Sequence, residues 1–599
     1  MKIGLVPQVI VNALHPSNSV PYVPLGLLSL AGALDRRRHT VDIVDLTAAV
    51  KDGRIPYDRD FESAAARLIH SRGFDLVGFS TFSAGYHHTL KIVQALKARA
   101  PSTLCVLGGP QASFCDEETL ASFPVDLIVR GEGEWTFEEL LEALEDDRGL
   151  DPIQGLSFRR GERILRTPDR PLVQDLDTLA LPAFDLYPLK HHPKAAVEAT
   201  RGCPYHCVYC ATSNYWGHRV RHKSIDRIYS EMVLLSDTYD VEYISFADDT
   251  FTINRKWTLA FCRHLVARGY RKPWLCSTRI DAVDDELLAA MAQAGCGHIF
   301  YGIESGSERV QKAIRKNIRI GRVVDNLRKT ASQGISVTAS LMMGFPDETE
   351  EDLKQTLQLR NRIQLIFPYK QAIQIHVLSP DVNTQITLEN QDRLRYDGFH
   401  SDGSGGELAR YDREMILAHR DLFMAYYYIE MTHLDREFVK LVHTFLSTAQ
   451  VICYWSSLYV MLRDGDPLRM AKRWIEAYRS HPVSGDVSPE APLLLRAVPS
   501  ATRFFASLFR MGGDVPAPVS ELYQHEFEMM RIKGGLAIDT AIRQKAAEHR
   551  AFSHRQFAYD PRETIALIRE DYRKVRTQRL KPTRIDYVPR RRPQTGRRG

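Results

Sequence analysis

The sequence predicts an α/β protein in three successive parts: a doubly wound, Rossmann-like parallel sheet, a partial (β/α)6 barrel and an all-helical C-terminal domain. Two stretches of the chain alternate short apolar runs with amphipathic helical patterns, and a stretch rich in Pro and Leu separates them. A chain of 599 residues is also too long for a single hydrophobic core. We expect a first domain at 1–150, a connector at 151–193, the barrel at 194–395, the helical domain at 396–572 and a basic tail at 573–599.

Five strand-like runs define the first domain, and a helical pattern follows each of them. Right-handed crossovers place the loops after parallel strands along one edge, where open α/β sheets bind ligands. Three of these loops are rich in Gly and small residues, which permit a close approach of a ligand to the backbone or simply a tight turn. The expected strands are Lys2–Val6, Val41–Leu46, Leu76–Ser80, Leu104–Gly108 and Leu127–Arg130, and the three turns are Ser80–Gly85, Gly108–Gln111 and Gly131–Glu134.

The alternation restarts near residue 196 with six βα-type units, which predict an open or partial barrel with its site at the carboxyl ends of the strands. The connector before it is expected to have little regular structure of its own. After residue 395 we expect long helices and no strand. The expected barrel strands are Val197–Thr200, Tyr243–Phe246, Trp274–Ser277, His298–Gly302, Val337–Met343 and Gln374–Val377, and the expected helices include Glu414–Thr432, Arg436–Leu462 and Pro467–Tyr478.

Composition indicates a globular protein, with 44% hydrophobic and 26% charged residues. The N-terminus starts with an apolar strand and has no signal-peptide pattern, so we expect a cytoplasmic location. The stretch Thr444–Leu462 has the length of a membrane span but contains Ser, Thr, Gln and Tyr, which favours a buried or interfacial helix.

The net charge of +5 is unevenly distributed. From Arg573 to Gly599 the chain has eleven Lys or Arg and one Asp, about +10, which leaves the rest near −5. Such a run is typical of a solvated, disordered end, and no nucleic-acid partner is expected.

Three of the nine cysteines lie within eight residues, at Cys203, Cys207 and Cys210. Nine cysteines are too sparse for a disulfide scaffold. Three thiolates on a [4Fe–4S] cubane leave one iron open for another ligand. A zinc site usually uses four ligands in paired motifs, and only His206 and His218 are available to complete one here. The spacing therefore favours an iron–sulfur cluster.

The CxxxCxxC loop after a first barrel strand resembles the radical SAM superfamily. That resemblance implies that the open iron binds S-adenosylmethionine (SAM), which one electron then cleaves to a 5′-deoxyadenosyl radical. It also implies a set of SAM-binding residues at successive strand ends, with Gly344–Thr349 as a further matching segment. The residues expected to bind SAM are Tyr209, Asp249, Arg279, Glu304 and Ser305.

A doubly wound domain directly before such a barrel resembles the cobalamin-binding radical SAM group, over roughly residues 1–380. Trp216–Ser224 and the pair Asp248-Asp249 also match that group. The resemblance implies cobalamin at the loops of the first sheet. The residues expected to contact it are Pro24, Leu25, Gly26, Ser80, Thr81, Phe82, Ser83, Gly108, Gly109, Gln111, Gly131 and Glu132.

The sequence departs from the related patterns in two places. The DxHxxG element of other cobalamin-binding domains is absent, and His15, His87 and His88 are the histidines that remain as candidates near cobalt, although a loop histidine is more often only a polar residue. A Rossmann-like domain without cofactor, or one that binds a nucleotide, therefore stays an alternative. The segment Leu378–Thr384 replaces the usual proline–glycine–threonine turn after the last strand.

The resemblance implies a biosynthetic enzyme with three cofactors: a [4Fe–4S] cluster, SAM and cobalamin. We expect methyl transfer, through methylcobalamin, to a carbon or phosphorus centre. The alternatives are oxidation, cyclisation or ring contraction without net methylation, polar methyl transfer, and a non-catalytic cobalamin or redox sensor. We expect a monomer with a small-molecule or peptide substrate and an electron donor such as flavodoxin or ferredoxin. No catalytic residue is assigned. The aromatic runs Tyr426–Tyr428 and Tyr454–Tyr459 are expected to pack between helices or to line a substrate pocket.

Overall fold

The computed structural model describes eleven stretches of the chain: 1–11, 21–192, 194–367, 369–400, 406–407, 412–480, 493–510, 514–533, 554–557, 559–576 and 583–586. Contacts divide it into two compact units. The first comprises Met1–Ile303, Gln311–Thr338 and Leu378–Glu430, and the second comprises Glu304–Val310, Ala339–Val377 and Met431–Gly599, within the described stretches.

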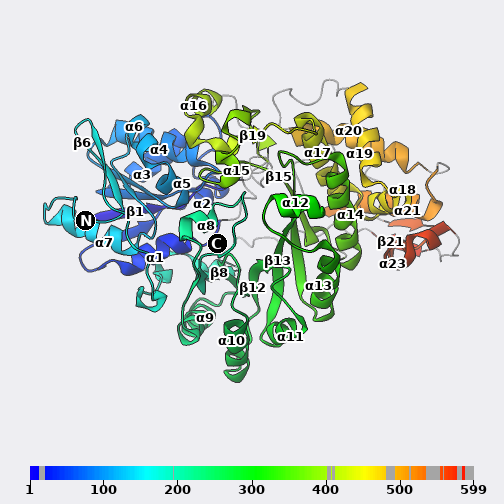
Figure 1. Ribbon diagram of the computed structural model, residues 1–599, viewed down its shortest axis with the longest axis horizontal. Coiled ribbons are helices and arrows are strands. Elements are labelled where there is room, and N and C mark those ends of the chain that lie inside the picture. Colours follow the sequence, from blue (N-terminus) through cyan, green and yellow to red (C-terminus); the bar gives the residue numbers. More distant parts are fainter. Residues whose placement is uncertain are drawn as a thin grey trace, which may run out of the picture. The chain divides into compact units, whose positions relative to one another are not determined.

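The first sheet has the strand order β2-β1-β3-β4-β5-β6-β7, and its first five strands are parallel. These strands are buried and rich in Val, Leu and Ile, because helices cover both faces of the sheet. Figure 1 shows α1 and α7 on one face and α3 and α4 on the other, which confirms the doubly wound prediction. The strands are β1 Lys2–Val6, β2 Thr40–Ile43, β3 Leu76–Ser80, β4 Leu104–Gly108 and β5 Leu127–Val129, and the helices are α1 Leu25–Ala33, α2 Leu46–Lys51, α3 Phe61–His70, α4 Tyr86–Arg99, α5 Pro110–Phe114, α6 Asp116–Ser122 and α7 Glu134–Glu145.

The connector has more regular structure than the sequence predicts. A hairpin of β6 Leu156–Arg160 and β7 Arg163–Arg166 continues the first sheet, with β6 antiparallel to β5. Two residues join the strands, and Gly161 adopts a φ of 61° there. A Gly in a two-residue loop between strands is a hairpin signal that the Pro and Leu content of the stretch concealed. The rest of the connector up to His191 contains only short 3-10 turns among its helices.

The second sheet has six strands in the order β15-β14-β13-β12-β11-β8. The pairs β8 with β11, β11 with β12, β12 with β13 and β14 with β15 are parallel, as the barrel prediction requires. The first expected strand is divided: Val197 ends β8, and Thr200 begins β9, which pairs with β10 outside the sheet. The strands are β8 Lys194–Val197, β9 Thr200–Arg201, β10 Arg221–His222, β11 Tyr243–Phe246, β12 Trp274–Arg279, β13 Cys296–Glu304, β14 Ser336–Met343 and β15 Ile373–Val377.

Helices alternate with these strands, as the βα pattern predicts. The longer ones begin with residues that cap them, such as Ser224 before α9 and Thr349 before α14. The helices are α8 Thr212–Trp216, α9 Ile225–Tyr239, α10 Arg255–Ala267, α11 Asp285–Gln293, α12 Glu308–Ala313, α13 Ile320–Ser332, α14 Glu350–Ile366 and α15 Gln385–Leu388.

The C-terminal part is mainly helical but contains short strands that the sequence did not predict. The predicted helix Glu414–Thr432 is wrong: α16 ends at Ala418, and Tyr427–Ile429 forms β19, in keeping with the strand preference of Tyr and Ile. The elements here are β16 Leu394–Tyr396, β17 Phe399–His400, β18 Gly406–Glu407, α16 Arg413–Ala418, β19 Tyr427–Ile429, α17 Arg436–Ile452, α18 Tyr454–Asp464, α19 Pro467–Ser480, α20 Leu493–Leu508, α21 Ala517–Lys533, β20 His554–Phe557, α23 Pro561–Asp571 and β21 Thr583–Asp586.

The expected long helix from Arg436 to Leu462 is two helices, divided at Cys453. The carboxylate of Glu526 accepts hydrogen bonds from the backbone amides of Trp455 and Ser456, at 2.6 and 3.0 Å, and so caps the start of α18. Since Glu526 lies about seventy residues later in the chain, no local pattern reveals this cap. In the basic tail, Thr583–Asp586 pairs with β20, and 577–582 and 587–599 lie outside the described residues.

No helix in the described stretches has the length and apolar character that a membrane span needs. The aromatic side chains of Tyr426, Tyr427, Tyr454 and Tyr459 are buried, in agreement with helix and loop packing.

Gly109, at the end of β4, is a sensitive point of the first sheet. Its φ of 97° and ψ of 176° belong to a region that only glycine adopts readily, and a Cβ there would lie 2.7 Å from the carbonyl oxygen of Thr81. We expect Gly109→Ala to lower the free energy of unfolding by about 1–3 kcal/mol. The urea midpoint of the first unfolding transition measures this, with Gly321→Ala in α13 as the control, because a Cβ meets nothing within 4 Å at that position. Equal midpoints for the two variants would show that the backbone at Gly109 does not require glycine.

Candidate active site

The three clustered cysteines lie in a loop between β9 and α8. The loop turns at Gly202, which has a φ of 106°, and a Cβ there would overlap the backbone oxygen of Arg219. Backbone hydrogen bonds hold the loop on two other segments: the amide of Val208 donates to Ile314, and the amide of Ile386 donates to Val208, at 3.2 and 2.9 Å. The backbone of Val208 therefore anchors the cysteine loop to two other segments of the chain.

The thiols of Cys203, Cys207 and Cys210 are free and partly exposed. Burial raises the pKa of the Cys207 thiol, while the cations Lys316 and Arg279 oppose that shift. Three unpaired thiols in one anchored loop beside two cations fit a cluster whose three thiolates carry negative charge. The loop is therefore suited to a [4Fe–4S] cluster with one open iron.

The zinc alternative finds no support in the geometry. His206 and His218 stack on each other, with ring centroids 4.1 Å apart, instead of converging on the thiols. Within the described stretches, no three His, Cys, Asp or Glu side chains converge on one metal ion. A cubane does not need such convergence, because each cysteine binds a different iron.

Of the expected SAM residues, Tyr209 lies in the cysteine loop and Arg279 lies beside it. Lys316 donates a hydrogen bond to the hydroxyl of Tyr209 at 3.0 Å. Arg279 ends β12, pairs with Asp281 at 2.8 Å and lies 3.9 Å from the ring centroid of Tyr205. Its Nη1 atom is buried without a hydrogen-bond partner. A buried, unpartnered donor next to the cysteines fits an anionic ligand such as the SAM carboxylate.

The acidic pair after β11 divides into two roles. Asp248 is buried and accepts hydrogen bonds from the amides of Ala199 and Thr200, and burial raises its pKa to about 7. Asp249 is exposed and interacts with Thr212, which also contacts the Cys210 thiol. Asp248 therefore fixes the end of β8, and Asp249 remains available to a ligand.

Glu304 and Ser305 follow Gly302, which is in register with Arg279 of the neighbouring strand. Glu304 is buried and has a φ of 71°, a backbone conformation that costs energy for a residue other than glycine and that active sites often contain. Its carboxylate accepts a hydrogen bond from Ser340 at 3.5 Å. Ser305 is fully buried, and its hydroxyl bonds to Thr356. Ser305 thus supports the turn in which Glu304 stands.

The loops expected to hold cobalamin meet at the carboxyl edge of the first sheet. The Thr81 hydroxyl donates to the Gly108 carbonyl at 2.8 Å and accepts from the Ala112 amide. The hydroxyl of Ser83 donates to Gln111 at 2.9 Å. Thr81, Ser83 and Gln111 therefore join the loops after β3 and β4 to each other. Pro24, Leu25 and Gly26 stand at the start of α1, and Gly131 follows β5, at the same edge.

Apolar side chains are exposed at this edge as well. Phe82 and Ile10 are 48% and 49% exposed, in the loops after β3 and β1. Gln8 fixes the first of these loops, because its side chain accepts from the Phe82 amide and donates to the Ala84 carbonyl. Large apolar side chains that are exposed to solvent are suited to contact the apolar face of a bulky cofactor. Gln8 was missed by the sequence analysis, since a lone Gln after a strand carries no signal.

Glu132 has a structural role and no free acceptor for a cofactor. Both oxygens of its buried carboxylate accept hydrogen bonds from Nη1 of Arg221, at 2.8 and 2.9 Å. One of them also accepts a hydrogen bond from Nη1 of Arg201 at 2.8 Å. The Val173 amide donates to it too. Arg201 further pairs with Glu134 at 2.6 Å and with Glu198 at 2.9 Å. We call Glu132, Glu134, Glu198, Arg201 and Arg221 the buried ion-pair cluster.

The histidines at the start of α4 contact protein groups, although Nε2 of His87 is buried without a hydrogen-bond partner, 3.8 Å from a carboxylate oxygen of Asp412. Burial lowers the pKa of His87, whose Nδ1 lies 3.0 Å from the hydroxyl of Tyr426. His88 pairs with Glu62 at 2.7 Å. The amide of Gly85 donates to the same Tyr426 hydroxyl at 2.9 Å, so this tyrosine holds the loop after β3. His15 lies outside the described residues.

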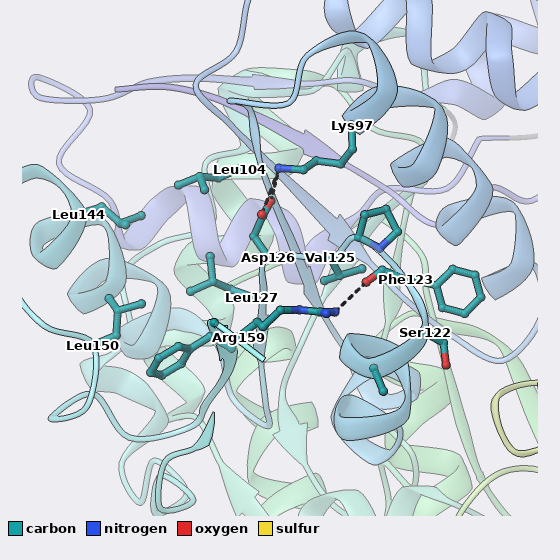
Figure 2. A pocket seen from close by; sticks show the side chains of 14 residues that line it. Lys97, Leu104, Ser122, Phe123, Val125, Asp126, Leu127, Leu144, Leu150 and Arg159 are labelled. Carbon is teal, nitrogen blue, oxygen red and sulfur yellow. Dashed lines mark hydrogen bonds and ion pairs between the residues drawn. The ribbon is translucent and has the colours of Figure 1, made fainter. Parts of the chain in front are cut away.

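A pocket of about 690 Å³ in the first domain is not part of this site. Leu104 and Leu127, the first residues of β4 and β5, line it, so it lies at the opposite edge of the sheet. Figure 2 shows that its charged residues already have partners: Lys97 pairs with Asp126, and Arg159 donates to the backbone carbonyl of Phe123.

The buried ion-pair cluster gives a sharp stability prediction. Glu132→Gln leaves two buried guanidinium groups with one carboxylate fewer, and breaking a buried pair costs about 3–5 kcal/mol. We expect a clear fall in the urea midpoint. Glu286→Gln, which breaks only exposed pairs, with Arg255 and Arg263, is the control and should leave the midpoint almost unchanged. A Glu132→Gln midpoint equal to that of the control would show that the cluster does not stabilise the fold.

Glu348 predicts a pH dependence. Burial raises its pKa to about 8, although the amides of Gly344 and Phe345 donate to it. A glutamate carboxyl in the unfolded chain has a pKa of about 4.3. Between this pH and pH 8 the unfolded state is ionised at Glu348 while the folded state keeps its proton, so stability falls as the pH rises through this range. Glu348→Gln cannot ionise and should show a flatter melting temperature between pH 5 and 9. Asp347→Asn, at the exposed neighbouring carboxyl, is the control, and identical pH profiles for wild type and Glu348→Gln would refute the expectation.

Comparison with known proteins identifies both α/β parts. The model of the radical SAM superfamily matches residues 197–360, and the model of the B12 binding domain matches residues 19–141. The first implies a [4Fe–4S] cluster and SAM, and the second implies cobalamin.

Among similar proteins, an uncharacterized methyltransferase of Pyrococcus horikoshii is 32% identical over 348 residues, which are 57% of this chain and 74% of that protein. The anaerobic magnesium-protoporphyrin IX monomethyl ester cyclase of Synechocystis sp. is 28% identical over 361 residues, 59% of this chain and 70% of that protein.

A solved structure shares the fold: the cobalamin-dependent S-adenosylmethionine radical enzyme OxsB with aqua-cobalamin and S-adenosylmethionine bound. It has a TM-score of 0.57 and 15% identity, over 92% of this chain and 80% of that chain. With both domain models matched and 32% identity across 74% of the Pyrococcus protein, the chain is an enzyme that belongs to the cobalamin-binding radical SAM family.

Proposed function

We propose that the protein is a methyltransferase that transfers a methyl group from SAM, by way of cobalamin, to a carbon or phosphorus centre of a biosynthetic substrate. The observation that carries the proposal is the cysteine loop on the same compact unit as the exposed apolar edge of the first sheet. The name of the Pyrococcus relative, a methyltransferase, supports transfer of a methyl group.

The cluster with SAM supplies a carbon radical, and cobalamin supplies a methyl group for transfer. Cys203, Cys207 and Cys210 would hold the cluster. The free Nη1 of Arg279 would bind the SAM carboxylate, and the exposed carboxylate of Asp249 would accept hydrogen bonds from its ammonium or ribose. Glu304, held in a strained turn, would contribute a second acceptor at the next strand end.

At the first sheet, Phe82 and Ile10 would cover an apolar face of the corrin and exclude water from it. Gly109 and Gly131 would let the cofactor approach the backbone. Pro24, Leu25 and Gly26 would contact it from the start of α1. Gln8, Thr81 and Gln111 would not touch it but would hold the loops in place through the hydrogen bonds described above.

The second candidate is a cyclisation without net methylation, because the Synechocystis relative is a cyclase. Polar methyl transfer uses the same cofactors without hydrogen abstraction from the substrate. A non-catalytic sensor would not need three intact cysteines with the free Arg279 donor beside them.

The experiment measures 5′-deoxyadenosine formed from SAM under anaerobic, reducing conditions. We expect the reconstituted wild type to form it and the triple variant Cys203→Ala, Cys207→Ala, Cys210→Ala to form none, because no protein ligand of the cluster remains. The matched control replaces Cys105, Cys262 and Cys453 by Ala, which are free and buried elsewhere, and should retain formation.

SAM with a deuterated methyl group then separates the candidate reactions in a panel of biosynthetic substrates. Appearance of the deuterated methyl group in the product supports the methyltransferase, and a product without it supports the cyclase class. Label transfer without any 5′-deoxyadenosine would indicate polar methyl transfer and overturn the radical route.

A further inference from the structure

A row of exposed cations lies next to the cysteine loop. Lys312 is in the last turn of α12, Arg315 is in the turn after this helix, Arg319 directly precedes α13 and Arg322 is in its first turn. All four are exposed and belong to the first unit. We call these four residues the basic ridge.

The basic ridge lacks counter-charges. Within the described part of the chain, none of its four side chains forms an ion pair, although neighbouring cations do: Arg328 pairs with Asp325, and Lys329 pairs with Asp285. Arg315 donates only to the neutral side chain of Gln385, at 3.0 Å. The ridge therefore presents about four uncompensated positive charges to solvent.

A hollow of about 740 Å³ lies beside the ridge, and Arg319 and Arg322 line it. Its acidic residues are already neutralised: Asp281 pairs with Arg279, Asp284 with Arg255, and Asp325 with Arg328. The charge that remains in this hollow is thus positive.

The ridge is connected directly to the loop that holds the cluster. Ile314, between Lys312 and Arg315, accepts the backbone hydrogen bond of Val208, and Lys316 bonds to the hydroxyl of Tyr209. Val208 and Tyr209 stand between the second and third cysteines. A partner seated on the ridge would therefore come close to the cluster loop from the solvent side.

We propose that the basic ridge is the docking surface of an acidic one-electron donor protein, an inference that rests on the proposed cluster function. In the step it serves, one electron leaves the anionic flavin hydroquinone of the donor, which becomes the neutral semiquinone, and the oxidised cluster [4Fe–4S]2+ becomes [4Fe–4S]+. No proton moves and no bond breaks. An exposed patch of one charge steers a partner of opposite charge and increases the association rate.

The exposure of all four side chains favours a protein partner over a small anion. A site built for a small anion has a few polar groups that converge in a buried setting, whereas the four cations of the ridge are exposed. The ridge instead extends from the end of one helix across a turn to the first turn of the next, which suits the broad charged rim of a protein interface.

The test is the rate at which the cluster is reduced, followed by the EPR signal of [4Fe–4S]+ after mixing the reconstituted holoprotein with reduced flavodoxin. The ridge variant is Arg319→Glu/Arg322→Glu. The matched control is Arg268→Glu/Arg271→Glu, which reverses two exposed cations between the end of α10 and the start of β12, at the other end of the strands. We expect a fall of roughly tenfold or more at low salt for the ridge variant and little change for the control. The wild-type rate should fall towards the variant's rate as salt increases.

Photoreduced 5-deazaflavin, a small uncharged reductant, serves as the second reductant. The proposal predicts that it reduces wild type, ridge variant and control equally fast. Equal reduction rates with flavodoxin for the ridge and control variants would overturn the docking surface. An equal fall of the reduction rate with both reductants in the ridge variant would overturn it too, because it would indicate a damaged cluster site. If deazaflavin yields no [4Fe–4S]+ signal in the wild type, the proposed function itself fails.

Discussion

The buried ion-pair cluster around Arg201 is the constraint on which the candidate site depends. Arg201 immediately precedes the cysteine loop, and its guanidinium binds two carboxylates, Glu132 and Glu134, from the segment after β5 of the first sheet. All three side chains are buried. Burial raises the pKa of Glu134, but the charge of Arg201 outweighs this and lowers it, so the carboxylate stays ionised. Because a buried charge is costly without its partner, the loop and the sheet edge cannot separate without a large loss of stability.

The arrangement explains why the first sheet and the cysteine loop belong to one compact unit. Tyr215 adds a hydrogen bond from its hydroxyl to the Gly131 carbonyl at 2.7 Å, and the guanidinium groups of Arg201 and Arg221 both lie within 6 Å of the Trp216 ring. Chemistry shared between two cofactors requires them to be held in a fixed relation. A rigid, desolvated contact at the base of both cofactor loops serves this requirement better than a solvated hinge would.

Much of the fold could be predicted because it rests on local patterns. Runs such as Lys2–Val6, Leu76–Ser80 and Leu104–Gly108 are buried on both faces, and each forms a strand with the predicted bounds. The cysteine triad could be predicted because its spacing is that of a cluster-binding loop. Contacts between residues distant in the sequence could not be predicted. They include the capping of α18 by Glu526, the hydrogen bond of Tyr426 to the loop after β3, and the ion pairs of Glu132 with two arginines of the barrel. Glu132 was predicted to bind cofactor because it follows a strand at the correct edge, and only the structure shows that its carboxylate is already occupied.

The proposed chemistry requires one chain to hold two metal cofactors, one in the cysteine loop and one at the first sheet. The most direct measurement is the number of iron and cobalt atoms per chain after anaerobic reconstitution with iron, sulfide and hydroxocobalamin. We expect about four irons and about one cobalt, with loss of the iron alone when the three loop cysteines are replaced by alanine. Iron without cobalt would contradict the role of the first sheet, and the absence of both metals would contradict the whole assignment.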